Sequence, residues 1–284
     1  MRTFVRTASL LALVASTSAV HAGAPWSISD RARLAQVLTG WDGTDPFGMN
    51  DCTCSDEAAD LSFALGTWST SLTTSECSFA HAEQDSTLSP FALSGSGLAS
   101  GGVPLVVPGL CLNLIGSEEG ESSLSCTFTV TTATQVRLRF LASVACEGCD
   151  AGPFGEPPHA KVTLFGGAGP LIDVEATSFA PNESDSFATL LTLTPGTYTV
   201  SAEAVVSTTQ IENVFWMNGS SASFLAVIEQ MCVASDLTGN GTVDAADLAA
   251  MLGAWGSGGA ADLNLNGVVD AADLAILLSS WGGC

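Results

Sequence analysis

Basic residues are scarce in this sequence. Its 284 residues include 7 Lys and Arg against 29 Asp and Glu, which gives a formal net charge of −22. A chain with so few cations cannot neutralise a row of phosphates, so the composition argues against nucleic acid and against an anionic membrane surface as partners. The same acidity suits an exported protein kept soluble by charge repulsion, or a protein that binds cations.

Long hydrophobic runs are also lacking, so the sequence predicts no transmembrane segment. A short apolar run at residues 10–15 follows two arginines and precedes a small-residue site at residues 20–22. This order is typical of a cleaved secretory signal peptide. We therefore predict a signal peptide at residues 1–22 and a secreted, extracellular mature chain. Loss of the two arginines changes the net charge from −22 to −24.

Signals of catalysis are few. Only His81 and His159 follow the predicted signal peptide, and no G-x-S-x-G nucleophile elbow is present. A glycosidase needs two facing carboxylates, for which the sequence offers the acidic cluster at residues 118–121 and the pair Asp173 and Glu175. Acidic runs of this kind are more often solvated surface. We therefore predict no catalytic residue and keep an enzyme as the alternative.

Aromatic residues suited to sugar binding are also few. Residues 23–231 contain four tryptophans and a single tyrosine. Trp216 lies in the sequence FWMNG, which is typical of a turn tip where a ring can be exposed, and the alternative is a core residue.

Cysteine, by contrast, is frequent: all nine cysteines follow residue 22. In an exported chain this number predicts a disulfide framework whose pairing the sequence does not define. Zinc is disfavoured because the CxxC at residues 146–149 has no second such pair and no suitably spaced histidine. The odd number leaves one cysteine over, and we consider Cys284 a candidate attachment point.

Short segments that alternate between apolar and polar residues recur between residues 61 and 229. The clearest are residues 125–130, 135–141, 161–165, 187–193, 197–202 and 222–228. Segments of this length separated by Gly, Pro, Asn and Ser predict antiparallel strands. They favour a mainly β fold, an antiparallel β-sandwich of jelly-roll type over residues 23–231, with a barrel as the alternative. Before them, residues 28–38 predict one short helix.

An internal repeat occupies the C-terminal end. Residues 236–256 and 262–282 align without a gap, and 14 of the 21 aligned positions are identical. The hydrophobic period changes from two to 3.6 at about Cys232. We therefore predict a second domain at residues 232–284.

Each copy spaces its oxygen-bearing residues as a twelve-residue calcium loop does. Such a loop supplies ligands from positions 1, 3, 5, 7, 9 and 12, the seventh through its backbone carbonyl, and has glycine at position 6. The first copy offers Asp236, Thr238, Asn240, Thr242, Asp244 and Asp247. The second copy offers Asp262, Asn264, Asn266, Val268, Asp270 and Asp273. We predict that these loops bind two Ca²⁺ ions.

Each loop continues into a helical pattern with one apolar face. The apolar positions are Leu248, Met251, Leu252 and Trp255 in the first copy and Leu274, Leu277, Leu278 and Trp281 in the second. They predict two helices that bury these faces against each other. Val243 and Val269, at position 8, are expected to exchange backbone hydrogen bonds. The alternative interpretation, Asx-rich turns that only cap helices, is disfavoured because both copies share the whole pattern.

The repeat resembles a type I dockerin, a duplicated loop-plus-helix module that binds calcium. Aspartate at position 12, in Asp247 and Asp273, and the lack of a helix before each loop match that family. The ending WGGC is similar to the GC-terminated dockerin-like tails of secreted planctomycete-type proteins. The resemblance implies a small all-α dockerin-like module with two F-hand calcium loops. It also implies a cohesin-like or other surface docking protein as partner, and association with the cell surface.

These predictions describe a secreted, cell-surface-displayed, non-catalytic protein. Its C-terminal repeat would mediate anchoring or protein docking, and its β-sandwich would be of adhesive or carbohydrate-binding type, with polysaccharide as a candidate ligand. The alternative is an extracellular polysaccharide-degrading enzyme, a glycoside hydrolase or lyase, with the same tail. A purely structural role in the cell envelope is a third interpretation.

Overall fold

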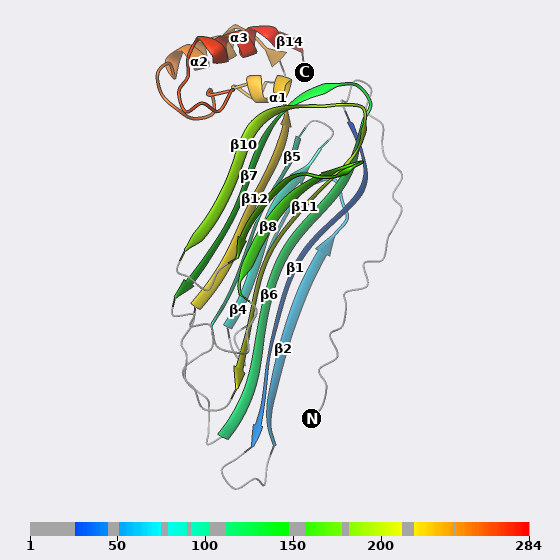
Figure 1. The fold of residues 1–284 in the computed structure, drawn as a ribbon, viewed down its shortest axis with the longest axis vertical. Helices are drawn as coiled ribbons and strands as arrows, with labels where there is room; N and C mark the ends of the chain where they lie inside the picture. Colours follow the sequence, from blue (N-terminus) through cyan, green and yellow to red (C-terminus); the bar gives the residue numbers. More distant parts are fainter. Residues whose placement is uncertain are drawn as a thin grey trace.

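The computed structural model describes residues 26–44, 51–74, 79–89, 92–102, 112–147, 157–177, 182–211, 219–240 and 242–283. In this part of the chain, two six-stranded antiparallel sheets lie face to face, and a small unit with short helices lies at one end of them (Figure 1). The predicted signal peptide and Trp216 lie outside the described residues.

The first sheet, sheet A, has the strand order β2-β1-β6-β11-β8-β9. Its strands are β1 (Trp26–Thr44), β2 (Asp51–Ser62), β6 (Leu112–Val130), β8 (His159–Gly166), β9 (Gly169–Thr177) and β11 (Gly196–Ile211). Sheet B has the order β10-β7-β12-β5-β4-β3. Its strands are β3 (Gly66–Thr74), β4 (Phe79–Leu88), β5 (Ala92–Gly102), β7 (Thr134–Glu147), β10 (Glu183–Leu193) and β12 (Gly219–Gln230).

The strand pairing makes β5 to β12 a jelly roll. β5 pairs with β12, β6 with β11, β7 with β10 and β8 with β9, so the pairs are nested around the β8–β9 turn. A chain paired in this way is one long hairpin, and rolling it up places successive strands in opposite sheets except at that turn. The hairpins β1–β2 and β3–β4 extend the two sheets beside β6 and β5. The sandwich part of the predicted fold therefore fits the structure.

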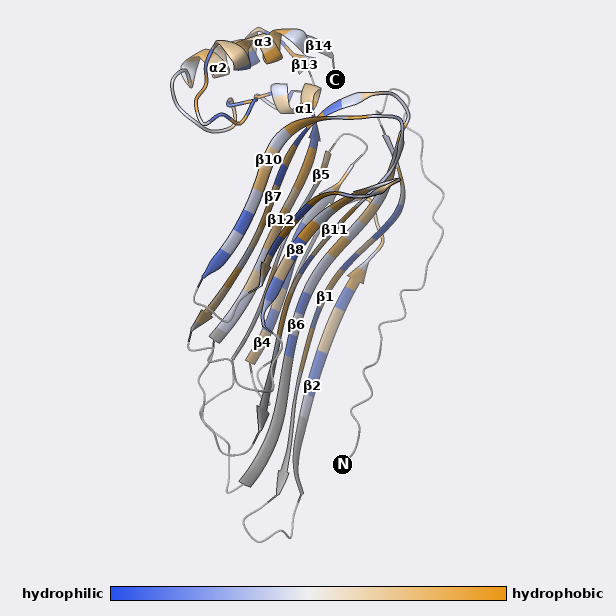
Figure 2. Ribbon diagram, in the orientation of Figure 1, coloured by the Kyte–Doolittle hydropathy of each residue, from blue (hydrophilic) through white to orange (hydrophobic). Residues whose placement is uncertain are grey.

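The core lies between the sheets and follows the period-two pattern of the sequence. Val136, Leu138 and Phe140 on β7 are at most 2% exposed, whereas Arg139 points outward and is exposed. Apolar and polar residues alternate along most strands of both sheets (Figure 2). Burial of each such large side chain stabilises the fold by about 1.5–3 kcal/mol.

Two arginines of β1 hold the loop that joins the sheets. Nε of Arg31 donates to the carbonyl oxygen of Phe63 at 2.7 Å. The guanidinium of Arg33 donates to the carbonyl oxygens of Ala64 and Gly66. These bonds fix the crossing from β2 in sheet A to β3 in sheet B.

The prediction of a short helix at residues 28–38 is wrong, because these residues lie in β1. Arg33, Ala35 and Val37 alternate inward and are fully buried. β1 is hydrogen-bonded to β2 on one side and to β6 on the other. Pairing with two neighbours outweighs the helical preference of a segment that contains Ala, Leu and Arg.

The C-terminal unit follows β12 without a linker. It contains α1 (Met231–Ser235), β13 (Thr242–Val243), α2 (Ala245–Gly253), α3 (Ala271–Ser279) and β14 (Gly282–Gly283). The prediction of a small all-α dockerin-like module is wrong, because the described residues here form three short helices, a two-stranded sheet and irregular loops. In these loops backbone N–H groups bind side-chain oxygens instead of helical carbonyls. No helix of the described part is long and apolar enough to cross a membrane.

Candidate functional site

The predicted calcium ligands lie in two segments that run into α2 and α3, with Asp247 and Asp273 in the first turns of these helices. In the first loop, Oδ1 of Asp236 accepts a hydrogen bond from the backbone nitrogen of Asn240 at 3.0 Å. Oδ1 of Asn240 accepts from the backbone nitrogen of Thr242 at 2.8 Å. Oδ1 of Asp247 accepts from both the backbone nitrogen and the hydroxyl of Thr238 at 2.9 Å. Loop positions 1, 3, 5, 7 and 12 are thereby brought together.

The second loop has the same arrangement. Oδ1 of Asp262 accepts from the backbone nitrogen of Asn266 at 3.1 Å, and Oδ1 of Asn266 accepts from that of Val268 at 2.9 Å. Oδ1 of Asp273 accepts from the backbone nitrogen of Asn264 at 2.9 Å. Two segments 26 residues apart in the sequence thus form equivalent hydrogen bonds between side-chain oxygens and loop backbone nitrogens.

The aspartates at loop positions 9 and 12 also cap the helices. Asp244 and Asp270 are the N-caps of α2 and α3, and each accepts a hydrogen bond from the backbone nitrogen two residues later at 2.7 Å. Oδ2 of Asp247 and of Asp273 accepts from the backbone nitrogen of the N-cap residue at 2.8 Å, which completes a capping box in each copy. The two interpretations of the sequence, ligand and cap, therefore fall on the same carboxylates.

Asp247 and Asp273 are fully buried. Burial by itself would raise the pKa of Asp247, but hydrogen bonds from Asp244 and Thr238 outweigh it, so this pKa lies below its ordinary value. No Lys, Arg or His follows residue 236 in the sequence. Hydrogen-bond donors, and not basic side chains of this segment, therefore stabilise the charge of the carboxylates.

The oxygen atoms of the two loops are of the kind that bind a hard divalent cation. Each loop offers three carboxylates, two side-chain amide or hydroxyl oxygens and one backbone carbonyl, which are ligand types that Ca²⁺ takes. An oxygen that accepts one N–H bond keeps a second lone pair. Among the described residues, no group of three or more His, Cys, Asp or Glu side chains is arranged to hold a metal ion. The Asn, Thr and backbone oxygens are therefore needed to complete the set of calcium ligands in each loop.

The two copies interlock through their position-8 valines. Val243 pairs with Gly282, which follows α3. The backbone of Val269 bonds to Gly256 and Ser257, which follow α2, at 2.9 and 2.7 Å. The expectation that the two valines bond to each other is therefore wrong: each bonds to the segment after the other copy's helix.

The predicted burial of the helix faces against each other is also only partly correct. Met251 and Leu277 are fully buried. Four residues are about half exposed, namely Leu252, Trp255, Leu278 and Trp281. The core of the unit contains instead Met231, Val243, Met251, Ala261, Leu263, Val269 and Leu277. Loop residues fill the space that a second helix face would take, because each helix has only nine residues.

A contact that the sequence did not reveal joins the sandwich to the segment between the two copies. Nη2 of Arg137 on β7 lies 2.7 Å from Oε2 of Glu229 on β12, and Nη1 donates to the carbonyl oxygen of Ala260 at 3.5 Å. Leu190 on β10 packs against the core of the C-terminal unit. The alternation of the predicted strand places Arg137 outward, but no sequence signal indicates what covers it.

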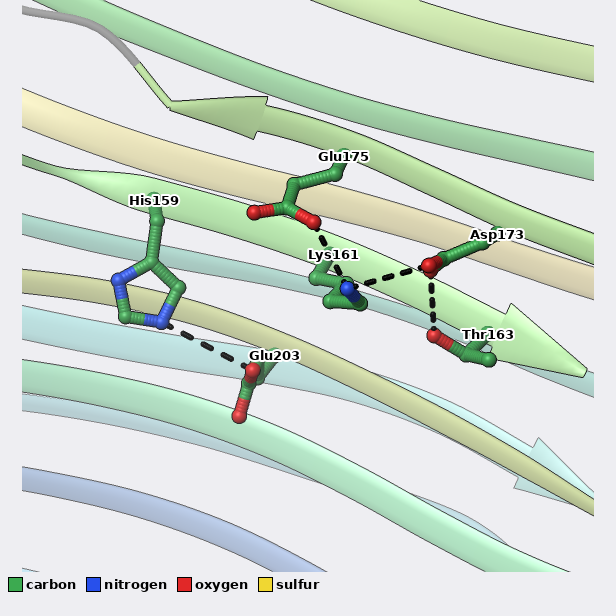
Figure 3. A network of polar contacts seen from close by, with 6 residues as sticks. All are labelled: His159, Lys161, Thr163, Asp173, Glu175 and Glu203. Atoms are coloured by element: carbon green, nitrogen blue, oxygen red, sulfur yellow. Dashed lines mark hydrogen bonds and ion pairs between the residues drawn. The ribbon is translucent and has the colours of Figure 1, made fainter. Parts of the chain in front are cut away.

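On the outer face of sheet A, a polar network joins β8 and β9 (Figure 3). Nζ of Lys161 lies 2.7 Å from Oε2 of Glu175 and 3.2 Å from Oδ2 of Asp173. The hydrogen bond to Glu175 is the main cause of the raised pKa of Lys161. The two carboxylates are therefore bridged by an ammonium, which is the geometry of a surface ion pair and not of an acid and a base that face each other across a substrate.

His81 lies on β4 of sheet B, with Nδ1 2.9 Å from Oγ1 of Thr73. The remaining catalytic candidates lie on sheet A. Nε2 of His159 is 3.8 Å from Oε1 of Glu203, too long for a hydrogen bond. Glu121 is half-buried and accepts a hydrogen bond from Nε2 of Gln36 at 2.8 Å. Burial, with the charges of Glu119 and Glu203, raises the pKa of Glu121. The side chain of Glu118 lies outside the described residues.

One cysteine of the sandwich is a free thiol. Cys126 on β6 is fully buried, and burial raises its pKa to about 12, which makes the thiol unreactive. Cys146 and Cys232 are disulfide-bonded. The side chains of the other six cysteines, Cys284 among them, lie outside the described residues. Because Cys126 is free, the odd number of cysteines no longer singles out Cys284.

Comparison with known proteins gives no family and no informative structural match for this chain. No protein family matches the sequence, and no curated protein matches it. Two solved structures are similar in part: the infectious bursal disease virus Gx strain and the VP2 subviral particle of infectious bursal disease virus. Both are 9% identical over 72% of this chain and 57% of theirs, with TM-scores of 0.22 and 0.20. This chain thus spans little more than half of theirs, and at these TM-scores the likeness supports no conclusion.

Proposed function

We propose that the C-terminal unit binds two Ca²⁺ ions, one in each of the loops 236–247 and 262–273. The observation that carries the proposal is the repetition of the oxygen array with equivalent hydrogen bonds in both copies. Helix capping alone requires only positions 9 and 12. It does not require the side-chain oxygens at positions 1 and 5 of both loops, which accept hydrogen bonds from loop backbone nitrogens.

The charge of the unit supports the same proposal. Residues 236–284 contain six aspartates and no basic residue, so two bound calcium ions change the charge from −6 to −2. At about 1 mM free calcium and a Kd of about 10 µM, each occupied site stabilises the folded unit by about 2.7 kcal/mol. For a unit with so small a core, calcium would therefore decide how much of it is folded.

Thermal unfolding of the mature protein in 1 mM calcium and in EDTA tests this proposal. We expect calcium to raise the unfolding temperature of the C-terminal unit and magnesium to do so less. Asp262→Asn should remove about half of the calcium-dependent shift, whereas Asp85→Asn, on an exposed position of β4, should leave it unchanged. The same unfolding curve in calcium and EDTA would refute the proposal.

We further propose that the protein is secreted and displayed at the cell surface. The C-terminal unit would attach to a cohesin-like or other surface protein, in keeping with its resemblance to dockerins. Two half-exposed Leu and Trp pairs at equivalent positions of the copies offer an apolar attachment surface. Pull-down from cell-surface proteins in calcium and in EDTA tests this: calcium-dependent capture, lost in Trp255→Ser/Trp281→Ser, is the expected result.

For the sandwich we propose a non-catalytic role, adhesive or carbohydrate-binding, with polysaccharide as the ligand. The ion pairing of Asp173 and Glu175 with Lys161 supports this role, because it occupies the predicted carboxylate pair. One observation favours the alternative of a polysaccharide-degrading enzyme, namely the raised pKa of half-buried Glu121 close to two other glutamates. A glycan array with a reducing-sugar assay separates them. Binding without turnover supports the first role, and turnover lost in Glu121→Gln supports the second.

A further inference from the structure

The four edge strands of the sandwich are protected to different degrees. An edge strand leaves a row of N–H and C=O groups without a partner strand, and proteins usually shield it with charge, proline or a covering segment. β2 carries four acidic residues, and β9 carries two acidic residues and a proline. β10 begins with two acidic residues, and its other half lies where Leu190 packs against the C-terminal unit. Three edges are therefore shielded.

The fourth edge, β3, carries neither charge nor proline, and no described strand pairs with its free side. Its nine residues, GTWSTSLTT, include no charged residue and no proline, in a chain with a net charge of −22. Threonine and tryptophan favour extended backbone. At β3, unlike the other edges, a second copy of this acidic chain can pair without placing carboxylates of the two edge strands against each other.

The sequence of β3 is nearly palindromic around Thr70. Residues 67–73 read TWSTSLT, which is the same in both directions except that tryptophan matches leucine. Two identical antiparallel strands related by a two-fold axis at Thr70 place Ser69 opposite Ser71 of the second copy. This symmetry is what a two-fold interface between identical strands requires.

The side chains on both faces of β3 are compatible with the antiparallel register centred on Thr70. Trp68 and Leu72 are half-buried on the inner face, where they pack against the small core that includes Ala80 and Ala82. In the register centred on Thr70, Trp68 faces Leu72 of the second copy and each covers apolar surface of the other. The outer face presents only the hydroxyl side chains at residues 67, 69, 71 and 73.

We propose that two copies of this protein associate through β3, antiparallel and with the two-fold axis at Thr70. The two six-stranded B sheets then join into one continuous sheet. A single pair of nine-residue strands is a small interface, so the dimer is weak, with a Kd on the order of tens of micromolar. Such an association becomes significant where copies are concentrated on a surface.

Sedimentation velocity of the mature protein from about 1 to 200 µM tests the proposal. The wild type should shift from monomer to dimer over this range. Ser69→Glu/Ser71→Glu places glutamates opposite each other in both serine pairs and should raise the dimer Kd at least about ten-fold. Ser69→Gln/Ser71→Gln has the same size without charge, and Ser184→Glu/Ser186→Glu adds the charge to β10 instead. Both controls should dimerise as the wild type does.

Two further readouts define the surface and the register. Thr70→Cys should form a disulfide-linked dimer on oxidation, and Thr67→Cys should not. Added NaCl should strengthen the dimer because it screens the repulsion between two acidic chains. A monomer at every concentration, a dimer that the two glutamates leave unchanged, or equal cross-linking at residues 67 and 70 would each overturn the proposal. A dimer lost in EDTA would do the same, because β3 contains no predicted calcium ligand.

Discussion

Arg33 is a buried cation whose hydrogen-bond partners are all neutral. Its guanidinium donates hydrogen bonds to two backbone carbonyls and to the hydroxyls of Ser62 and Ser86, and it lies 5.4 Å from the ring centre of Trp68. Burial lowers its pKa, yet an arginine stays charged at any physiological pH. The positive charge is therefore stabilised by the dipoles of these carbonyl and hydroxyl groups, which include the carbonyls of the loop that Arg33 fixes.

Removal of this cation should destabilise the sandwich. We expect Arg33→Met to lower the free energy of unfolding by about 2–4 kcal/mol, because the loop carbonyls of Ala64 and Gly66 and the hydroxyls of Ser62 and Ser86 lose their donor. Arg139→Met, on the exposed face of β7, is the control and should change it by about 0.5 kcal/mol or less. Urea denaturation of both variants measures the difference. Equal midpoints would show that the loop does not depend on Arg33.

Glu121 gives a pH dependence of stability that is opposite in sign to that of a carboxylate in an ion pair. Because burial raises its pKa, the folded state favours the protonated form, and its contribution to stability is lost as the pH rises from the ordinary glutamate pKa through the raised value. Glu121→Gln should therefore raise the melting temperature at pH 7 by about 1–3 °C and have no effect below about pH 4. Glu57→Gln, on an exposed position of β2, is the matched control. A gain from Glu121→Gln that persists at low pH would contradict this explanation.

At the scale of the element, each calcium loop combines a helix cap with a candidate ion site. Oδ1 and Oδ2 of Asp273 accept hydrogen bonds from the backbone nitrogens of Asn264 and Asp270 in this structure. Asp273→Asn should therefore cost about 1 kcal/mol in EDTA, through the cap alone. In 1 mM calcium the cost should rise by about 2.7 kcal/mol, through loss of one site. Denaturation in both buffers separates the two roles, and an equal cost in both would leave only the cap.

The elements that the sequence predicted best are those whose pattern is local. Alternation correctly predicted strands at residues 135–141 and 197–202, and the 26-residue repeat located both loops and both helices. β1 was missed because its residues 28–38 include good helix formers such as Ala, Leu and Arg, and because no sequence pattern reveals the two neighbouring strands that pair with it. The bonds of Val243 and Val269 were missed because their partners lie in the other copy.

At the scale of the whole molecule, strand pairing was beyond the reach of sequence patterns. β5 and β12 pair although more than a hundred residues separate them, and no local signal encodes the nested order. The pattern of charged residues, in contrast, can be recognised from the sequence alone. Lys161 is the single lysine of the chain, and the sequence already singles out the acidic pair Asp173 and Glu175 that it bridges in the structure.

In the described part of the chain, Arg137 and Leu190 join the sandwich to the C-terminal unit. Arg137 links Glu229 of β12 to the carbonyl oxygen of Ala260, two residues before the second loop. Arg137→Ala should increase hydrogen exchange at residues 254–263 by about ten-fold, because it leaves the acceptors Glu229 and Ala260 without this donor. Exchange in the core strands β6 and β11 should not change. Unaltered exchange at residues 254–263 would show that the contact of Leu190 is sufficient.

Calcium titration calorimetry of the mature protein tests the central claim most directly. We expect two calcium ions per chain for the wild type, one for Asp236→Asn and one for Asp262→Asn, because each variant removes the position-1 carboxylate of a single loop. No heat of binding in the wild type, or a stoichiometry that neither variant changes, would contradict the assignment of one ion to each copy.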